Sequence, residues 1–395
     1  MVKALSPTSK WGWDKLDDYW RLLPSAVSFV KEGDGMITTE GKMVTSRIIE
    51  CLAKNATANG AEFIFNTKAE QLVKDDSGKV CGVIATAEDG SHVQYNAVKG
   101  VILATGDISG NKAMLKDWAP ITLRADVCGY YPAGGNMGDG ITMGLWAGAA
   151  LSKSPSAPMV HLSNQQSVLS ARLMCWLAVN REGLRYGAEM PVEPLITNAR
   201  MNQPGNVAWS IYDGNFAQFV QQQNPESYES MLYSIDRATG EQVYIQSKID
   251  NAVNNGLIIT ADTLEELAEE VGMPVDTFLA TVERYNKWCD SGVDEDFGVP
   301  ANWLSKIGVP PFYAEPVPTT MLVCIMGLHV NNDSQVCNAD DEPIPGLFAV
   351  GNVQGDFFGN SYTVHCPGIS HGRAITFGNL VGAALAQDTV ISKTA

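Results

Sequence analysis

The pattern of apolar and polar residues predicts a series of short elements in the first 150 residues. Apolar residues at helical spacing predict a helix over residues 41–60, which ends at Asn59-Gly60. Strands are expected at residues 61–66, 69–74, 80–86 and 93–97. Polar turns at residues 75–78 and 89–90 join the last three strands, so these three are predicted to form a β-meander.

Two continuous apolar runs end in loops that contain glycine. Residues 101–104 lead into Thr105-Gly106, and residues 346–350 lead into Gly351-Asn352. A buried strand that ends in small residues is typical of an open α/β sheet, in which ligands bind at the carboxyl ends of the strands.

Two further glycine-containing segments precede predicted helices. Residues 134–140 precede a helix over 141–150, and residues 367–370 begin the last helix, which runs to about residue 386. Free N–H groups and the helix dipole make such a start suitable for an anion, although a structural turn explains a lone glycine loop equally well.

The middle of the chain differs in composition from its two ends. Residues 155–320 are richer in Gln, Asn and Pro, and apolar residues at helical spacing predict helices over 262–271 and 274–291. The last segment returns to the glycine-rich pattern of the first. We interpret the middle segment as a separate substrate or cap domain.

Composition excludes several classes of protein. Of the 395 residues, 45% are hydrophobic and 18% are charged, so a large core is expected. The 27 basic against 44 acidic residues give a net charge of −17, which disfavours nucleic-acid binding.

The eight cysteines show no metal-binding spacing and are expected to be free thiols. The chain is expected to be soluble, without a signal peptide or a membrane span, and its compartment stays open.

Several short motifs occur together in an order that resembles one protein family. They are residues 102–106 (ILATG), 138–140 (GDG), 179–186 (VNREGLRY), 345–352 (PGLFAVGN) and 375–382 (ITFGNLVG). Together they make the chain similar, over roughly residues 40–395, to flavoproteins of the fumarate reductase, succinate dehydrogenase and 3-ketosteroid Δ1-dehydrogenase superfamily. The resemblance implies an α/β fold: a Rossmann-like FAD-binding domain of residues 1–159 and 320–395, with an α+β cap domain of residues 160–319 inserted in it.

The resemblance also implies the cofactor and its contacts. FAD is expected to add or remove two hydrogens across a carbon–carbon bond that a carbonyl group activates. The positions that match the family's cofactor contacts are Ala69 at the adenine, Thr105 and Gly106 at the pyrophosphate and ribose, Asp139, Gly351 and Asn352 beside the flavin and its ribityl chain, and Gly368, Ile369 and Ser370 at the flavin carbonyl. Arg185, in the VNREGLRY motif, is expected to form a structural salt bridge.

One element of the family is missing from this sequence. Family members begin with a strand–GxGxxG–helix unit that binds the FAD pyrophosphate, and this chain contains no GxGxxG. The chain is therefore expected to lack the first βαβ unit and to hold FAD weakly or not at all by itself. The alternative is a non-catalytic fragment or subunit that needs a partner carrying the dinucleotide-binding unit. The surface that the missing unit leaves is then expected to favour self-association.

The substrate-binding positions also depart from fumarate reductases. The His and Arg that hold a dicarboxylate in those enzymes fall here at Phe358 and Tyr362. Because a dicarboxylate needs cationic partners, the resemblance implies an apolar, aromatic or steroid-like carbonyl substrate. Tyr362 matches the tyrosine that acts on the substrate in ketosteroid dehydrogenases, and His365 and His161 are the other candidate catalytic residues. A packed tyrosine and ordinary polar histidines are the alternatives. An electron-donor protein is a further expected partner.

Overall fold

The structure is a computed structural model in which the chain divides into two compact units. It describes residues 46–128, 134–154, 156–162, 168, 175–189, 195–223, 225, 232–235, 242–359, 362 and 369–393. Unit 1 comprises Met1–Leu123, Tyr130–Met159 and Leu322–Ala395, and unit 2 comprises Arg124–Gly129 and Val160–Met321. Within the described ranges, no helix has the length and apolar character that crossing a membrane requires.

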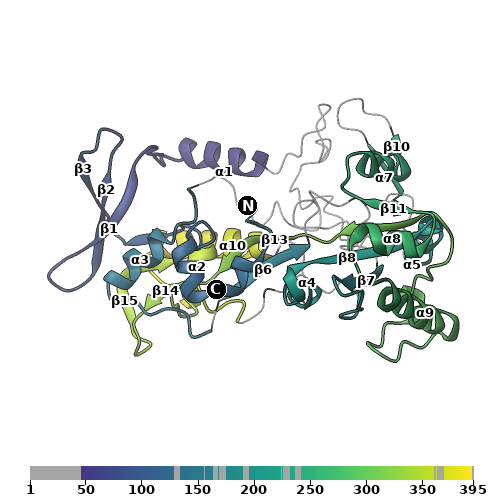
Figure 1. Ribbon diagram of the computed structural model, residues 1–395. Coiled ribbons are helices and arrows are strands. Elements are labelled where there is room, and N and C mark those ends of the chain that lie inside the picture. Colours follow the sequence, from purple (N-terminus) through teal and green to yellow (C-terminus); the bar gives the residue numbers. More distant parts are fainter. Residues whose placement is uncertain are drawn as a thin grey trace. The chain divides into compact units, whose positions relative to one another are not determined.

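Both units contain helices and strands (Figure 1). Unit 1 contains α1 (Ser46–Ala58), β1 (Lys68–Lys74), β2 (Val80–Thr86), β3 (His92–Asn96), β4 (Val101–Leu103), α2 (Lys112–Trp118), α3 (Asp139–Trp146), β14 (Gln335–Cys337), β15 (Pro343–Ala349), η6 (Gly351–Val353), α10 (Ile369–Ala386) and η7 (Ile391–Lys393). Unit 2 contains β5 (Val127–Cys128), β7 (Leu177–Asn180), α4 (Leu195–Met201), η4 (Pro204–Asn206), β8 (Ala208–Asp213), α5 (Phe216–Gln223), β9 (Tyr233–Ile235), β10 (Gln242–Tyr244), α7 (Ile245–Asn254), β11 (Ile259–Ala261), α8 (Leu264–Val271), α9 (Val275–Ser291), η5 (Ala301–Trp303) and β12 (Phe312–Pro316). The chain passes between the units within η3 (Pro120–Arg124), β6 (Ala157–Leu162) and β13 (Thr319–Ile325), and once more near residue 129.

Two small sheets form the framework of unit 1. The predicted meander is confirmed, because β1 pairs with β2 and β2 with β3, both antiparallel. Strands β4 and β15 are parallel neighbours with Ala349 opposite Leu103, and β14 is antiparallel to β15. Helix α10 packs against β15 through a buried cluster that includes Phe348 and Val381. The loops that follow β4 and β15 therefore leave the parallel pair at the same edge.

The strand expected at residues 61–66 is wrong. This segment is irregular, and the side chains of Phe63, Ile64 and Phe65 are 49%, 52% and 77% exposed. An apolar run is stable as a strand only where a neighbouring strand satisfies its backbone N–H and C=O groups. In the described part of the chain no strand pairs with these residues, so their apolar character did not produce a strand.

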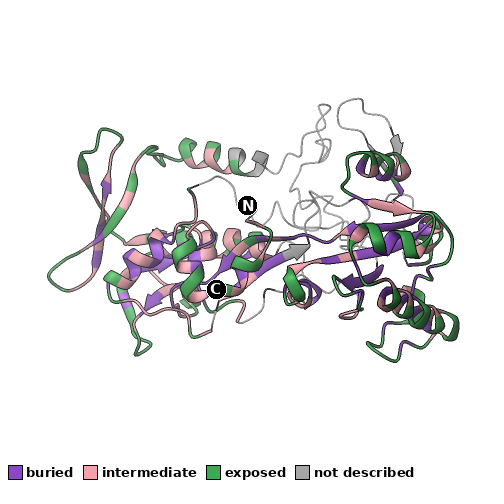
Figure 2. Ribbon diagram, in the orientation of Figure 1, coloured by how far each residue is buried: buried purple, intermediate pink, exposed green. Residues whose placement is uncertain are grey.

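A four-stranded antiparallel sheet in the order β11-β12-β8-β7 organises unit 2. Successive side chains point to opposite faces, as strand geometry requires. Ile211 and Phe312 pack with residues of α8 and α9, whereas Tyr212 and Tyr313 pack with residues of α5 and α7. Figure 2 shows β7 and β8 buried along most of their length, which agrees with helices covering both faces of this sheet.

Arg185 is buried between two carboxylates, which confirms the expected structural salt bridge. Its Nε and Nη2 donate to Glu189 at 2.7 and 2.6 Å, and its Nη1 and Nη2 donate to Asp294 at 2.8 Å each. The side chains of Arg185 and Glu189 are 3% exposed and that of Asp294 is 0% exposed. The guanidinium also lies over the rings of Tyr285, Trp288 and Phe297. The triad therefore joins the loop after β7 to the segment that follows α9.

Acid is expected to weaken unit 2 through Asp294. Burial disfavours its ionised carboxyl, but hydrogen bonds from Arg185 and from the backbone of Val299 and Phe297 outweigh burial and lower the pKa from 3.8 to about 2. Because the folded pKa lies below the unfolded value, this group stabilises the fold fully above about pH 4, and the effect is lost as the pH falls toward 2. Thermal unfolding of wild type and Asp294→Asn between pH 2 and 6 should give a difference that shrinks with acid. A constant difference would contradict the ionic role.

Candidate functional site

The loop after β4 approaches the glycine-rich loop before α3 so closely that glycine is required. Gly106 has a φ of +79°, and a Cβ on it would lie 2.0 Å from Oδ1 of Asn136. Helix α3 begins against the same loop, because a Cβ on Gly140 would lie 2.0 Å from Oγ1 of Thr105. These two contacts bring Asp139, at the start of α3, close to the Thr105-Gly106 pair.

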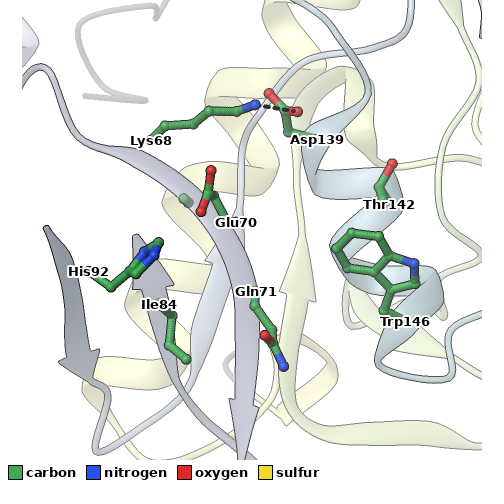
Figure 3. Close-up of a pocket in the computed structure, with 9 residues that line it drawn as sticks. Lys68, Glu70, Gln71, Ile84, His92, Asp139, Thr142 and Trp146 are labelled. Carbon is green, nitrogen blue, oxygen red and sulfur yellow. Dashed lines mark ion pairs between the residues drawn. The ribbon is translucent and has the colours of Figure 1, made fainter. Parts of the chain in front are cut away.

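A pocket of about 580 Å³ lies beside β1 and α3 (Figure 3). It contains two of the predicted cofactor contacts, Ala69 on β1 and Asp139 on α3. The Nζ of Lys68 lies 3.5 Å from a carboxylate oxygen of Asp139, at one end of the pocket. The other lining residues are Glu70, Gln71, Ile84, His92, Thr142 and Trp146. Its walls thus combine charged groups with the exposed ring of Trp146, a lining suited to a polar, partly aromatic ligand.

A buried carboxylate connects the loops that follow β4 and β15. Asp107 is 0% exposed and accepts hydrogen bonds from the backbone N–H and the hydroxyl of Ser109 and, at 3.0 Å, from Nδ2 of Asn352. Burial raises the pKa of Asp107, and the hydrogen bonds from Ser109 and Asn352 oppose this effect. Asn352 is therefore held in one orientation, with its Oδ1 pointing away from Asp107.

Two residues in the first turns of α10 donate hydrogen bonds to the side-chain oxygen of Asn352. Its Oδ1 accepts hydrogen bonds from Nη2 of Arg373 at 2.9 Å and from Oγ of Ser370 at 3.3 Å. Ser370 and Ile369, both predicted contacts, are the first two residues of this helix and are half-buried. One N–H of Asn352 has no partner among the described residues and is available for a ligand.

Tyr362 belongs to the same network. Its side chain is 3% exposed and packs with Met159 and Ile325, and its ring lies 4.7 Å from that of Phe358. The phenol lies near the backbone N–H and the hydroxyl of Ser370, and both of these groups lower its pKa. Burial raises the pKa of Tyr362, against the effects of Arg373 and of Ser370, so the hydroxyl keeps its proton at neutral pH. Tyr362, Ser370 and Asn352 thus form one connected set in unit 1.

The structure leaves part of the predicted site untested. His365 and Gly368 lie outside the described residues, and for His161 only the backbone, in β6, is described. Gly351, with a φ of +70°, begins η6 directly before Asn352. Among the side chains that the structure describes, no three His, Cys, Asp or Glu residues come together as metal ligands would.

Two residues of the network were missed by sequence reasoning, Asp107 and Arg373. The residues around Asp107 in the sequence do not indicate a role in the site, because its hydrogen-bond partner Asn352 is 245 positions away. Arg373 has one: it is the only Asp, Glu, Lys or Arg in the helix Ile369–Ala386, which is otherwise mostly apolar. A lone cation on an apolar helix that follows a glycine loop could have been named as a candidate from the sequence.

Replacing Gly140 with Ala is expected to disrupt the site. The new methyl group would overlap Oγ1 of Thr105, so α3 and the β4 loop must separate, at a cost of about 1–3 kcal/mol in the free energy of unfolding. Gly378→Ala is the matched control, because a Cβ there meets nothing within 4 Å. Inside α10 that change should stabilise by about 0.5–1 kcal/mol. Chemical denaturation measures both, and equal effects of the two variants would contradict the close contact.

Comparison with known proteins identifies the family. The family model described as "FAD binding domain" matches residues 35–364. Vinyl phenol reductase from Lactiplantibacillus plantarum is 28% identical over 355 residues, which cover 86% of this chain and 71% of that protein. 3-Oxosteroid 1-dehydrogenase from Mycolicibacterium smegmatis is 31% identical over 375 residues, covering 85% and 61% of the two chains.

The fold has a counterpart among solved structures. A 3-ketosteroid-Δ4-(5α)-dehydrogenase from Rhodococcus jostii matches with a TM-score of 0.64 at 24% identity, covering 89% of this chain and 66% of that chain. The chain spans as little as 32% of the length of other curated relatives. The expected family and its cofactor are nevertheless confirmed, because the matched residues make up most of the sequence. The chain belongs to the FAD binding domain family of flavoproteins.

Proposed function

We propose that this chain is the FAD-binding part of an oxidoreductase that reduces or forms a carbon–carbon double bond next to a carbonyl group. Its substrate in this proposal is apolar, aromatic or steroid-like rather than a dicarboxylate. The names of the relatives support the reaction class, because they include a vinyl phenol reductase, named for a substrate with a carbon–carbon double bond, and a 3-oxosteroid 1-dehydrogenase, named for a substrate with a carbonyl group. FAD supplies the hydride chemistry, and the residues of the chain hold and orient the reactants.

Unit 1 is the proposed flavin-binding domain, and unit 2 is the proposed cap. The pocket with Ala69 and Asp139 suits the polar, adenosine end of a dinucleotide. Thr105, Gly106 and Gly351 keep backbone close to the same edge of the β4–β15 pair, where a ligand meets strand ends. Oε1 of Gln354, a buried oxygen without a hydrogen-bond partner among the described residues, fits a site that a polar group completes.

One observation carries the substrate assignment: a buried phenol in an apolar cluster. The Tyr362 hydroxyl meets Ser370 at the start of α10, and Met159, Ile325 and Phe358 surround its ring. A protonated phenol in such a place can polarise a carbonyl oxygen or deliver a proton to carbon. In this proposal Tyr362 has that role, with His365 and His161 as the remaining candidates, and Gly368, Ile369 and Ser370 present the start of α10 to the flavin carbonyl.

The activity test uses the purified full chain incubated with FAD. Retained flavin absorbance shows binding, and chemical reduction followed by a panel of enones and dicarboxylates shows which compounds reoxidise the flavin. Reoxidation by aromatic or steroid-like enones, with no response to fumarate, is the expected result. Turnover of fumarate at a comparable rate would overturn the substrate assignment.

A second candidate is a subunit that acquires its dinucleotide-binding unit from a partner. Strand β4 is an edge strand in the described part of its sheet, and Ile102 on it is 38% exposed, which favours added protein at that edge. A colourless protein that gains flavin only when a partner or a second copy is present would support this candidate. An electron-donor protein is a further proposed partner.

A further inference from the structure

Arg373 is a buried cation without an acidic partner in the described part of the chain. Its side chain is 3% exposed. Two hydrogen bonds are present, from Nη2 to Oδ1 of Asn352 at 2.9 Å and from Nη1 to the carbonyl of Gln354 at a long 3.4 Å. Its Nε has no hydrogen-bond partner among the described residues, and no described carboxylate forms an ion pair with it.

This arrangement contrasts with that of two other buried guanidinium groups in the described part of the chain. Arg185 is neutralised by Glu189 and Asp294, and Arg200 lies 3.2 Å from a carboxylate of Asp126. Burial lowers the pKa of Arg373 to about 10, while Tyr362 and Asp107 act in the opposite direction, so the group still carries its charge at neutral pH. An unpaired buried charge is costly, and a guanidinium with free N–H groups is best compensated by a planar oxyanion that accepts two hydrogen bonds.

The surroundings of Arg373 specify the shape of the missing anion. The guanidinium lies 5.1 Å from the ring centre of Phe357 and 4.9 Å from that of Phe358, and Phe358 in turn packs on Tyr362. Phe357 is 41% exposed, so its ring is the cover that an entering ligand can displace. A flat, aromatic ligand would displace the Phe357 ring and place its own ring against the guanidinium of Arg373.

The presence of a single guanidinium at this site indicates that the ligand carries a single negative charge. Arg373 is the only arginine whose side chain is described in unit 1. The resemblance to fumarate reductases matches their two cationic substrate-binding positions to Phe358 and Tyr362, which carry no charge. One guanidinium pairs with one carboxylate. A dianion would leave its second carboxylate among aromatic rings, at a large desolvation cost.

We propose that Arg373 binds the carboxylate of the substrate, and that the substrate is therefore an aromatic α,β-unsaturated monocarboxylic acid. This inference rests on the proposed function and narrows its substrate class. Asn352 and Asp107 act as positioning residues: Asp107 fixes the Asn352 amide, whose oxygen orients the guanidinium. Tyr362 packs on Phe358, as the guanidinium of Arg373 does, so the carboxylate and the proton donor contact neighbouring parts of one molecule.

The test compares three probes on the FAD-loaded full chain: trans-cinnamate, the neutral ketone benzalacetone, which keeps the same ring and double bond, and fumarate. Flavin absorbance changes report the dissociation constants. We expect cinnamate to bind more tightly than fumarate. Arg373→Gln should weaken cinnamate about 10- to 100-fold and leave benzalacetone within about threefold, because only the charge-assisted hydrogen bonds are lost. Arg373→Lys should restore part of the cinnamate affinity.

Lys99→Gln is the matched control for the loss of one positive charge. Lys99 bonds the carbonyl of Leu385 at the far end of the same helix, and its side chain is 44% exposed. This variant should bind all three probes as wild type does. Equal weakening of cinnamate and benzalacetone by Arg373→Gln would assign Arg373 a structural role, and unchanged cinnamate binding would exclude its contact with the carboxylate. Either result overturns the proposal.

A second measurement separates this proposal from the proposed function. If the purified chain retains no flavin, the proposed function fails for this chain, and thermal unfolding of the flavin-free protein then decides the role of Arg373. Cinnamate should raise the melting temperature of wild type and of Lys99→Gln but not of Arg373→Gln, since a ligand stabilises only the fold that binds it. Absence of any shift in wild type would overturn the carboxylate site.

Discussion

Replacing Tyr362 with Phe is expected to lower the turnover of the FAD-loaded protein about 100-fold or more on its best substrate. The change removes one oxygen, so the apolar contacts of the ring with Met159, Ile325 and Phe358 remain. What is lost is a phenol whose pKa burial raises, so that it keeps its proton, and which lies near Ser370. Stopped-flow reoxidation of reduced flavin by substrate measures the proton-dependent step directly.

Tyr95→Phe is the control for this experiment. Tyr95 is a half-buried residue of β3 in the meander of the same unit, and losing its hydroxyl should change neither flavin content nor turnover. Flavin content should also be equal in wild type and Tyr362→Phe. If Tyr362→Phe turns over at the wild-type rate, the phenol is a packing residue, and His365 becomes the next candidate proton donor.

Replacing Arg185 with Ala is expected to have the largest effect on stability, about 3–5 kcal/mol in the free energy of unfolding. The variant would leave the carboxylates of Glu189 and Asp294 buried without their common partner, and would remove a cation from the rings of three aromatic residues. Urea denaturation, followed by the fluorescence of the tryptophans that pack in unit 2, measures the change.

Arg284→Ala provides a matched comparison on the neighbouring helix α9. Arg284 pairs with Asp296 and lies over Trp288, as Arg185 also does, but its side chain is 62% exposed. Exposed ion pairs contribute about 0–1 kcal/mol, so this variant should be nearly as stable as wild type. Similar losses for the two variants would show that burial of the Arg185 triad is not the source of its stabilisation.

The sequence predicted those parts of the fold that short-range patterns specify. Apolar runs and polar turns located the meander of β1, β2 and β3, helical spacing located α8 and α9, and the segment at residues 367–370 located the start of α10. The segment of Phe63–Phe65 has the same apolar character as a strand, yet no described strand pairs with it. Whether an apolar run becomes a strand depends on a neighbour elsewhere in the chain, which local pattern does not contain.

The sequence predicted the candidate site residues that stand in glycine-containing motifs. It did not predict Asp107 and Arg373, which contribute to the site because they are buried there. Thr105, Gly106, Asp139 and Asn352 stand in motifs that predict a ligand at strand ends and helix starts. The motifs say nothing of the partners that hold Asn352, because Asp107 and Arg373 gain their meaning only from burial and from contacts across the fold. The sequence has no cation at Phe358 or Tyr362, the positions that the resemblance matches to the fumarate-binding residues, but Arg373 on α10 lies beside both of them.

The parallel pairing of β4 with β15 has a consequence for how the protein is made. Residues that meet at this edge, such as Asp107 and Asn352, are 245 positions apart, and a ribosome adding about 5–20 residues per second needs more than ten seconds to produce the second after the first. During that interval β4 has no partner from β15, while most of unit 2, which is nearly continuous in sequence, emerges and can fold. The nascent chain therefore carries an unpaired apolar strand for most of its synthesis, and binding of chaperones at this stage is the expected protection against aggregation.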